Sequence, residues 1–117
     1  MTIRQGDVFW LDLGEPAGSG PGFLHPYVVV QSDLFNASKI QTVVVCELTS
    51  NVQRAGAPGN VLLRKGEGNL KRECVANVSQ LYTVDKSALV EKTGALPKGR
   101  VADIWSGLKL LLEPRDV

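Results

Sequence analysis

The chain has 117 residues, a formal net charge of +1, 44% hydrophobic residues and 21% charged residues. This length suits one domain with one core, so we expect a single domain over residues 1–117, and the composition excludes a disordered chain. The near-neutral charge does not indicate a nucleic-acid partner, so any basic surface must be local. No apolar run approaches the roughly 20 residues of a membrane span, and the N-terminus lacks a signal peptide. We therefore expect a soluble cytoplasmic protein without a membrane partner.

The two cysteines, Cys46 and Cys74, each lie in an apolar, strand-like segment. In a reducing cytosol, two buried thiols are more common than a disulfide, although two cysteines are enough to form one disulfide. The chain has one histidine and no close pair of cysteines, so it offers no zinc-ligand pattern, and no acidic cluster suggests a magnesium site. We therefore expect no metal and no other cofactor.

The N-terminal third alternates between strands and breakers. Residues 7–13 (DVFWLDL) predict a strand with Phe9, Leu11 and Leu13 on one face. Residues 14–26 are rich in glycine and proline and predict a long loop, which in a compact domain is usually functional or disordered. That loop contains His25, the only histidine.

Strand-like segments continue through the middle of the chain. The runs YVVVQ and TVVVCELT are rich in β-branched residues without clean alternation, which is typical of strands covered on both faces. Between them, Ser32 or Asp33 can cap one short helical turn. Further segments rich in strand-forming residues follow at 60–64, 73–78, 80–85 and 88–94.

The one long helix is expected at the C-terminus. Pro97 suits a first helical position and Pro114 stops the helix. Its apolar residues recur at helical spacing and predict a core or interface stripe made of Val101, Ile104, Trp105, Leu108, Leu111 and Leu112. Many short strands with one terminal helix indicate a mainly β fold, a small and strongly bent β-barrel.

Several of these segments, in this order and spacing, resemble the MazF/PemK toxins, which are endoribonucleases of toxin–antitoxin pairs. The similarity covers nearly the whole chain and is weakest from about residue 56 to residue 71. It is carried by Gly6-Asp7 before a tryptophan-containing strand, Ala17-Gly18, Pro26 before a β-branched strand, Leu34-Phe35-Asn36, VVVCELTSN, and Gln80 with Thr83-Val84-Asp85.

The resemblance implies an SH3-like barrel of the CcdB/PemK type with a C-terminal helix. It also implies a homodimer that cleaves single-stranded RNA at a short sequence without a metal, using the RNA 2′-hydroxyl as nucleophile. A cognate MazE-like antitoxin would neutralise it by threading a disordered tail through the RNA groove.

His25 stands where the family usually carries an arginine, directly before the proline of the second strand. An imidazole can exchange a proton near neutral pH and, when protonated, can offer positive charge to a phosphate. We therefore interpret His25 as a catalytic residue. The alternative is a loop histidine held beside Pro26.

Thr49 ends the TVVVCELT strand and matches the catalytic threonine or serine of the family. Its hydroxyl can donate a hydrogen bond to the charge that develops on the phosphate. Ser50 and Asn51 extend a polar cluster that we expect to contact RNA. The alternative for Thr49 is a strand-end cap. Glu47, on the same strand face, is a possible base, although a solvated glutamate is the commoner case.

Three further residues are candidate RNA contacts. The family match predicts that the amide of Gln80 reads a base edge, although a plain strand-end role is equally open. Phe23 and Tyr27 flank His25 and can stack an unpaired base, but barrel packing would account for them equally well. The segment RKGEGNLKR, residues 64–72, carries a local basic excess that can follow phosphates or simply be solvated.

Two other functions fit such a barrel. A gyrase poison of the CcdB type shares the fold and acts through its C-terminal helix, but it ends in tryptophan-glycine-isoleucine, whereas this chain ends LLLEPRDV. A barrel that binds RNA or protein without cutting also remains open, because the family arginine is absent. The fold alone cannot separate these functions, and the matched residues favour the nuclease.

Overall fold

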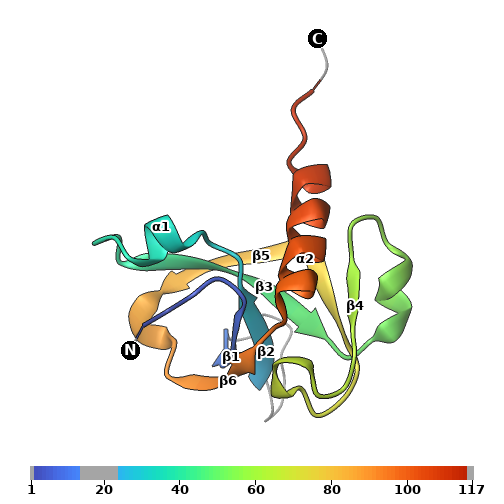
Figure 1. Cartoon of the computed structure of the whole chain (residues 1–117), viewed down its shortest axis with the longest axis horizontal. Coiled ribbons are helices and arrows are strands. Elements are labelled where there is room, and N and C mark those ends of the chain that lie inside the picture. The colour runs from blue at the N-terminus through green and yellow to red at the C-terminus, as the bar shows by residue number, and fades with distance from the viewer. Residues whose placement is uncertain (1, 14–23, 116–117) are drawn as a thin grey trace.

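The computed structural model describes residues 2–13 and 24–115. Within these residues, six strands form one antiparallel sheet in the order β4-β5-β3-β2-β1-β6, and a C-terminal helix packs against it (Figure 1). The strands are β1 (Asp7–Asp12), β2 (Leu24–Val29), β3 (Thr42–Thr49), β4 (Val61–Leu63), β5 (Cys74–Asp85) and β6 (Glu91–Ala95). The helices are α1 (Asp33–Asn36) and α2 (Lys98–Leu111), with 3₁₀ turns η1 (Val52–Gly56), η2 (Glu67–Asn69) and η3 (Lys86–Ala88).

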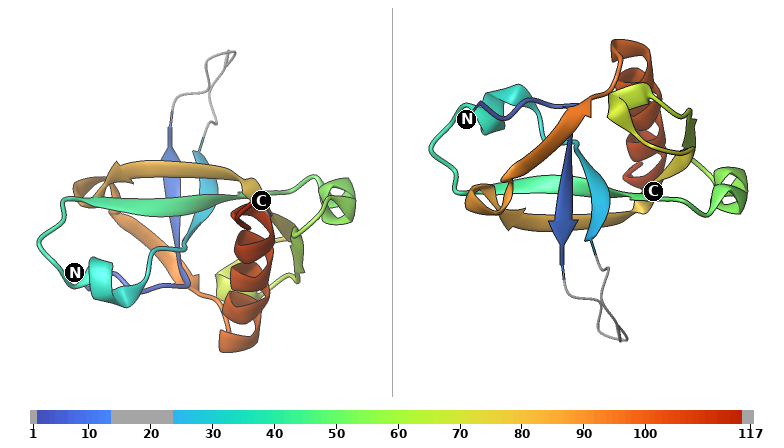
Figure 2. Two further views of the ribbon diagram at one scale, coloured as in Figure 1. Left: turned by 90° about the horizontal axis from the view of Figure 1, so that it is seen from above. Right: turned by 90° about the horizontal axis from the view of Figure 1, so that it is seen from below.

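The sheet curls strongly, and its two edges are joined through η2. The turn η2 follows edge strand β4 in the chain, and the side chain of Asn69 donates to the carbonyl of Thr93 in the opposite edge strand β6 at 2.8 Å. In Figure 2, β1 and β2 (blue) run at a steep angle to β3 and β5 (green and gold), which shows how strongly the sheet curls. The expected mainly β fold, a small bent barrel with a C-terminal helix, is confirmed.

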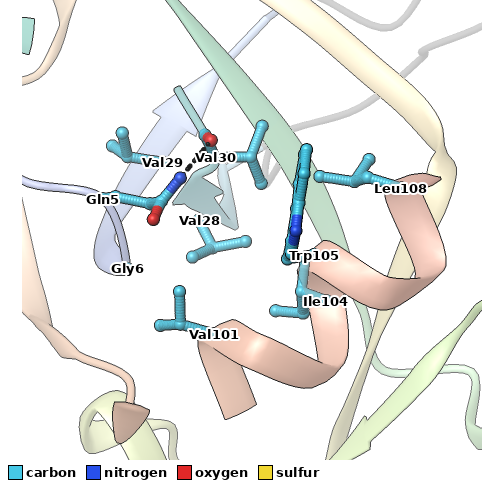
Figure 3. A pocket seen from close by; sticks show the side chains of 9 residues that line it. All are labelled: Gln5, Gly6, Val28, Val29, Val30, Val101, Ile104, Trp105 and Leu108. Atoms are coloured by element: carbon cyan, nitrogen blue, oxygen red, sulfur yellow. Dashed lines mark hydrogen bonds between the residues drawn. The ribbon is translucent and has the colours of Figure 1, made fainter. Parts of the chain in front are cut away.

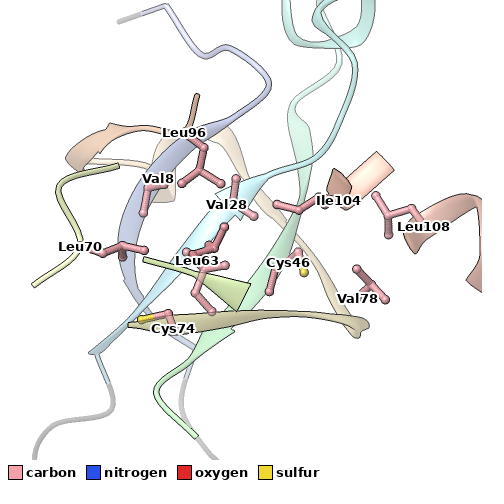
Figure 4. Packing of buried hydrophobic residues seen from close by; sticks show 12 residues of the cluster. Val8, Val28, Cys46, Leu63, Leu70, Cys74, Val78, Leu96, Ile104 and Leu108 are labelled. Atoms are coloured by element: carbon pink, nitrogen blue, oxygen red, sulfur yellow. The ribbon is translucent and has the colours of Figure 1, made fainter. Parts of the chain in front are cut away.

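Apolar side chains pack on both faces of the sheet. Phe9, Leu11 and Tyr27 belong to one buried cluster, against which Leu13 packs, as the alternation of residues 7–13 predicted. Val28 and Cys46 belong to the second cluster, which α2 covers with Ile104 and Leu108 (Figure 4). Both faces of β2 and β3 are therefore covered, which explains their nearly continuous apolar sequence.

The structure corrects the expected strand pattern at β5. Residues 73–78 and 80–85 were expected to form two strands, but β5 is a single strand with an irregularity at that point. Its pairing with β3 shifts between Cys46 and Leu48, so residues 77–80 stand opposite Glu47 alone. The buried Asn77 accepts hydrogen bonds there from Asn60 and Ser79, both at 3.2 Å. A bulge, rather than a break, accommodates these polar residues.

The expected loop also ends earlier than the sequence suggested. Strand β2 begins at Leu24, so His25 and Pro26 lie within the strand and pair with Leu11 and Trp10 of β1. His25 is therefore a strand residue, held by the backbone of the sheet.

Helix α2 follows the expected limits but only part of its apolar stripe is covered. Pro97 occupies the N-cap, one position before the first helical residue. Ile104 and Leu108 are buried, whereas Trp105 is 56% exposed and lies beside Val30 at an apolar crevice (Figure 3). Leu110, Leu111 and Leu112 are also exposed, where the end of α2 projects from the sheet (Figure 1).

Both cysteines are free and buried, as expected. Burial raises the pKa of the Cys46 thiol to about 12. Within the described residues, no three His, Cys, Asp or Glu side chains lie close enough together to hold a metal ion. None of the helices in the described part of the chain is long and apolar enough to cross a membrane.

Candidate active site

The site lies where strands β2 and β3 separate. Tyr27 and Glu47 form the last pair between them at this end. His25 lies two residues beyond that pair on β2, and Thr49 lies two residues beyond it on β3. Because side chains alternate along a strand, His25 and Thr49 fall on the same face as Tyr27 and Glu47. The structure thus brings the two predicted catalytic residues to matching positions at one end of the sheet.

Each of these residues is held by its other neighbouring strand. His25 pairs with Leu11 of β1, and Thr49 pairs with Val75 of β5. The backbones of both residues are therefore fixed, although β2 and β3 no longer pair with each other beyond Tyr27 and Glu47. Side chains presented from paired strands are positioned more firmly than side chains on a loop.

A cleft of about 380 Å³ lies at this end of the sheet, mainly on the face of Trp10, Pro26 and Leu48, whose side chains alternate with those of His25 and Thr49. His25 and Ser50 line it from β2 and from the residue after β3, and Lys71 and Arg72 line it from the segment before β5. None of the described residues that line it carries a carboxylate. Its apolar lining comes from Trp10, Leu24, Pro26, Leu48, Leu70 and Cys74.

Thr49 closes the turn that follows β3. Its Oγ1 accepts a hydrogen bond from the backbone N–H of Asn51 at 3.1 Å, and the Asn51 side chain accepts from the N–H of Gln53 at 3.2 Å. The strand-end cap expected as the alternative is therefore present. This bond uses a lone pair of the Thr49 hydroxyl and leaves its hydrogen able to donate. Thr49 itself does not line the cleft, whereas its neighbours Leu48 and Ser50 do.

Tyr27 does not present its ring to RNA. It is only 2% exposed and belongs to the buried cluster on its face of the sheet. The expectation that Tyr27 stacks an unpaired base is therefore wrong for this structure, because cross-strand packing occupies the ring. Phe23, the other flanking aromatic residue, lies outside the described residues.

Gln80 is exposed at the bulge of β5. Its side-chain oxygen accepts a hydrogen bond from the hydroxyl of Tyr82 at 3.2 Å. Glu47 of β3, opposite the bulge, is only partly buried. The bulge therefore presents a polar edge beside the strand that carries Thr49.

The basic segment 64–72 divides into two parts. Lys71 and Arg72 line the cleft, but Arg64 lines a separate depression with Arg100 and Asp103. Burial raises the pKa of the Cys74 thiol, and the nearby charge of Arg72 opposes that rise.

Trp10 is a cleft residue that the sequence did not single out. Its strand was expected to alternate, with Phe9 facing the core, so the same alternation places Trp10 on the opposite face. That face is covered only in part at this end of β1, and Trp10 is partly exposed. The covering residues come from distant parts of the chain, so the alternation alone could not reveal the cleft.

Comparison with known proteins decides the family. Residues 4–112 match the model of the PemK-like, MazF-like toxins of type II toxin–antitoxin systems. The chain is a member of the PemK/MazF toxin family. It is 37% identical over 113 residues to endoribonuclease MazF6 of Mycobacterium tuberculosis, covering 97% of this chain and 99% of that protein. It is 32% identical over 110 residues to endoribonuclease MazF of Staphylococcus epidermidis, covering 94% and 91% of the two chains.

Solved structures of PemK/MazF toxins share the fold. A mycobacterial endoribonuclease in complex with its cognate antitoxin superimposes with a TM-score of 0.76 at 23% identity, over 97% of this chain and 99% of that one. MazF from Deinococcus radiodurans superimposes with a TM-score of 0.74 at 23% identity, with the same coverage. The bent barrel with its C-terminal helix is therefore the architecture of this toxin family.

Proposed function

We propose that this protein is the toxin of a type II toxin–antitoxin pair and cleaves single-stranded RNA. Family membership supports the class of activity, and the relatives that cover nearly all of the chain are endoribonucleases. The observation that carries the proposal is the position of His25 and Thr49, at matching places on the separating ends of β2 and β3 beside a cleft with cationic residues.

The reaction uses the 2′-hydroxyl of the RNA as nucleophile. His25 accepts the 2′-hydroxyl proton, the 2′-oxygen forms a bond to phosphorus, and the bond from phosphorus to the 5′-oxygen breaks. Water supplies the proton for the leaving 5′-oxygen. The Thr49 hydroxyl donates to the phosphate oxygens as their negative charge grows. The products are a 2′,3′-cyclic phosphate and a 5′-hydroxyl, and the chemistry needs no metal.

Ser50, Asn51 and Gln80 are the proposed RNA contacts outside the catalytic pair. All three are exposed polar residues: Ser50 and Asn51 directly follow β3, and Gln80 lies at the bulge of β5. Their amides and hydroxyl can hydrogen-bond to the edges of unpaired bases. The substrate is therefore a single strand, whose bases are free to reach them.

We also propose a homodimer and a MazE-like antitoxin as partners. The exposed apolar residues of α2, including Trp105 and Leu111, offer area that a second chain can bury. Sedimentation at micromolar concentration measures the oligomeric state directly, and a monomer would contradict the dimer.

The test of the activity is to incubate the purified protein with a long RNA in the presence of a chelator and to map the new ends. We expect cleavage at a short recurring sequence, with cyclic phosphate and 5′-hydroxyl ends. Cleavage that stops in chelator and returns with magnesium would overturn the mechanism. Intact RNA that is nevertheless bound would favour a barrel that binds without cutting.

A further inference from the structure

Lys71 and Arg72 line the cleft, and within the described part of the chain they have no partner of opposite charge. Among residues 2–13 and 24–115, no carboxylate lies within ion-pair distance of either side chain. Arg100, by contrast, is bound by the carboxylate of Glu67 at 3.0 Å. An unpaired cationic pair beside an open cleft attracts an anionic ligand.

The backbone of this pair is anchored on both sides. Leu70 before it and Cys74 after it are buried in the core, 4% and 3% exposed. The Cys74 thiol also donates to the carbonyl of Arg72 at 3.6 Å. The two side chains are therefore exposed on a short segment whose ends are fixed, which limits the entropy lost when they bind a ligand.

His25 alone cannot supply charge to the phosphate while it acts as a base. An imidazole accepts a proton only in its neutral form, and the hydroxyl of Thr49 is neutral as well. Arginine and lysine remain charged throughout the pH range of the reaction. Among the described residues that line the cleft, Lys71 and Arg72 are the ones that can place a permanent positive charge near the phosphate.

We propose that Arg72, with Lys71 beside it, binds the phosphodiester backbone of single-stranded RNA in the cleft that His25 also lines. The assignment deepens the proposed nuclease function and rests on it for the identity of the ligand. RNA fits the cleft better than a free anion does, because the partly exposed Trp10 lines the same cleft and offers a ring on which a base can stack.

The test measures binding, so that it does not depend on cleavage. The probe is a single-stranded RNA with 2′-O-methyl groups throughout, which cannot be cut by the 2′-hydroxyl route. Its dissociation constant is measured against salt concentration at pH 8. The variants are Arg72→Gln, Arg72→Lys and the control Lys65→Gln, which removes one charge from the same connection outside the cleft.

We expect Arg72→Gln to weaken binding about tenfold and to reduce the slope of log K against log salt by about 0.7, the contribution of one phosphate contact on a single strand. Arg72→Lys should restore most of the slope, and Lys65→Gln should change neither quantity. An unchanged slope in Arg72→Gln would overturn the proposal. An equal loss in Lys65→Gln would do the same, since only net charge would then matter.

Two further outcomes separate this proposal from the nuclease function. If Arg72→Gln weakened the binding of polyglutamate but not the binding of RNA, the RNA assignment would be overturned. The wild-type protein could also fail to cut unmodified RNA while its binding of RNA depends on Arg72. That result would support the cleft assignment and contradict the nuclease function. The thermal unfolding of each variant serves as the folding control, because Arg72 is exposed.

Discussion

The ring of Tyr27 meets the ring of Tyr82 edge to face, with their centroids 5.7 Å apart and their planes at 87°. Tyr27 lies on β2 two residues from His25, and Tyr82 lies on β5 two residues from Gln80, with β3 between the two strands. The Tyr82 hydroxyl also donates to the side chain of Gln80. This aromatic pair therefore connects the strand of the proposed base with the strand of a proposed RNA contact.

Replacing Tyr27 tests whether its ring belongs to the core. Tyr27→Ala should lower the free energy of unfolding by about 3–5 kcal/mol, because a fully buried aromatic side chain is removed. Tyr82→Ala should cost less, because Tyr82 is only partly buried. Denaturant unfolding measures both. A Tyr27→Ala variant of normal stability with weakened RNA binding would place the ring at the RNA surface instead.

The packing of α2 on the chain before β4 depends on Gly107. A Cβ atom at this position would collide with the carbonyl oxygen of Gly59. Gly107→Ala should therefore reduce stability by about 1–3 kcal/mol, the usual cost of overpacking, although alanine favours helix. The matched control is Gly99→Ala in the same helix, where a Cβ meets nothing within 4 Å. The melting temperature of Gly99→Ala should stay the same or rise. Equal losses of stability in Gly107→Ala and Gly99→Ala would contradict the close contact between Gly107 and Gly59.

The stability of the protein in acid should depend on Glu67. Its carboxylate accepts hydrogen bonds from the backbone of Arg64 at 2.7 Å and from Arg100, and these hold the pKa of Glu67 below its ordinary value. The unfolded chain then binds the proton first, so this contribution is complete above the ordinary pKa and is lost as the pH falls through the lowered one. Glu67→Gln should remove this part of the acid dependence. If the wild type and Glu67→Gln had identical pH profiles of unfolding free energy, the hydrogen bonds of Glu67 would contribute nothing to stability.

His25 is expected to produce a pH limb in single-turnover cleavage. The rate should rise with pH as the base loses its proton, and then level off. His25→Ala should nearly abolish cleavage and remove the limb. His25→Arg should keep some activity without the limb, since arginine stays charged. If the alanine variant cleaved RNA with an unchanged pH profile, His25 would not be catalytic and would be only a strand residue beside a proline.

Thr49 is expected to act on the chemical step more than on binding. Thr49→Ala should slow single-turnover cleavage roughly 10²–10³-fold, the usual effect of removing one preorganised donor to a developing charge. Its effect on the dissociation constant for a 2′-O-methyl RNA should be much smaller. Thr49→Ser keeps the hydroxyl and is the control. An unchanged rate in the alanine variant would exclude Thr49 from the site.

Local sequence determined the elements themselves. The alternation around Phe9 predicted which residues of β1 face the core, and the β-branched run ending at Thr49 matched the limits of β3. Pro97 and Pro114 bracketed α2, although Pro97 proved to be its N-cap. These features depend on residues that are neighbours in the chain, so periodicity and turn chemistry are enough to predict them.

Tertiary structure decided which side chains are available for chemistry. The sequence could not show that Tyr27 is buried while Trp10 and Arg72 share a cleft with His25, or that Arg64 lies elsewhere. It also could not show that β5 passes through a bulge rather than ending there. Each outcome depends on which remote segments cover a given face and on the register between strands. The packing of the whole barrel sets these contacts. A local sequence pattern therefore cannot predict which distant residue will lie opposite a given side chain.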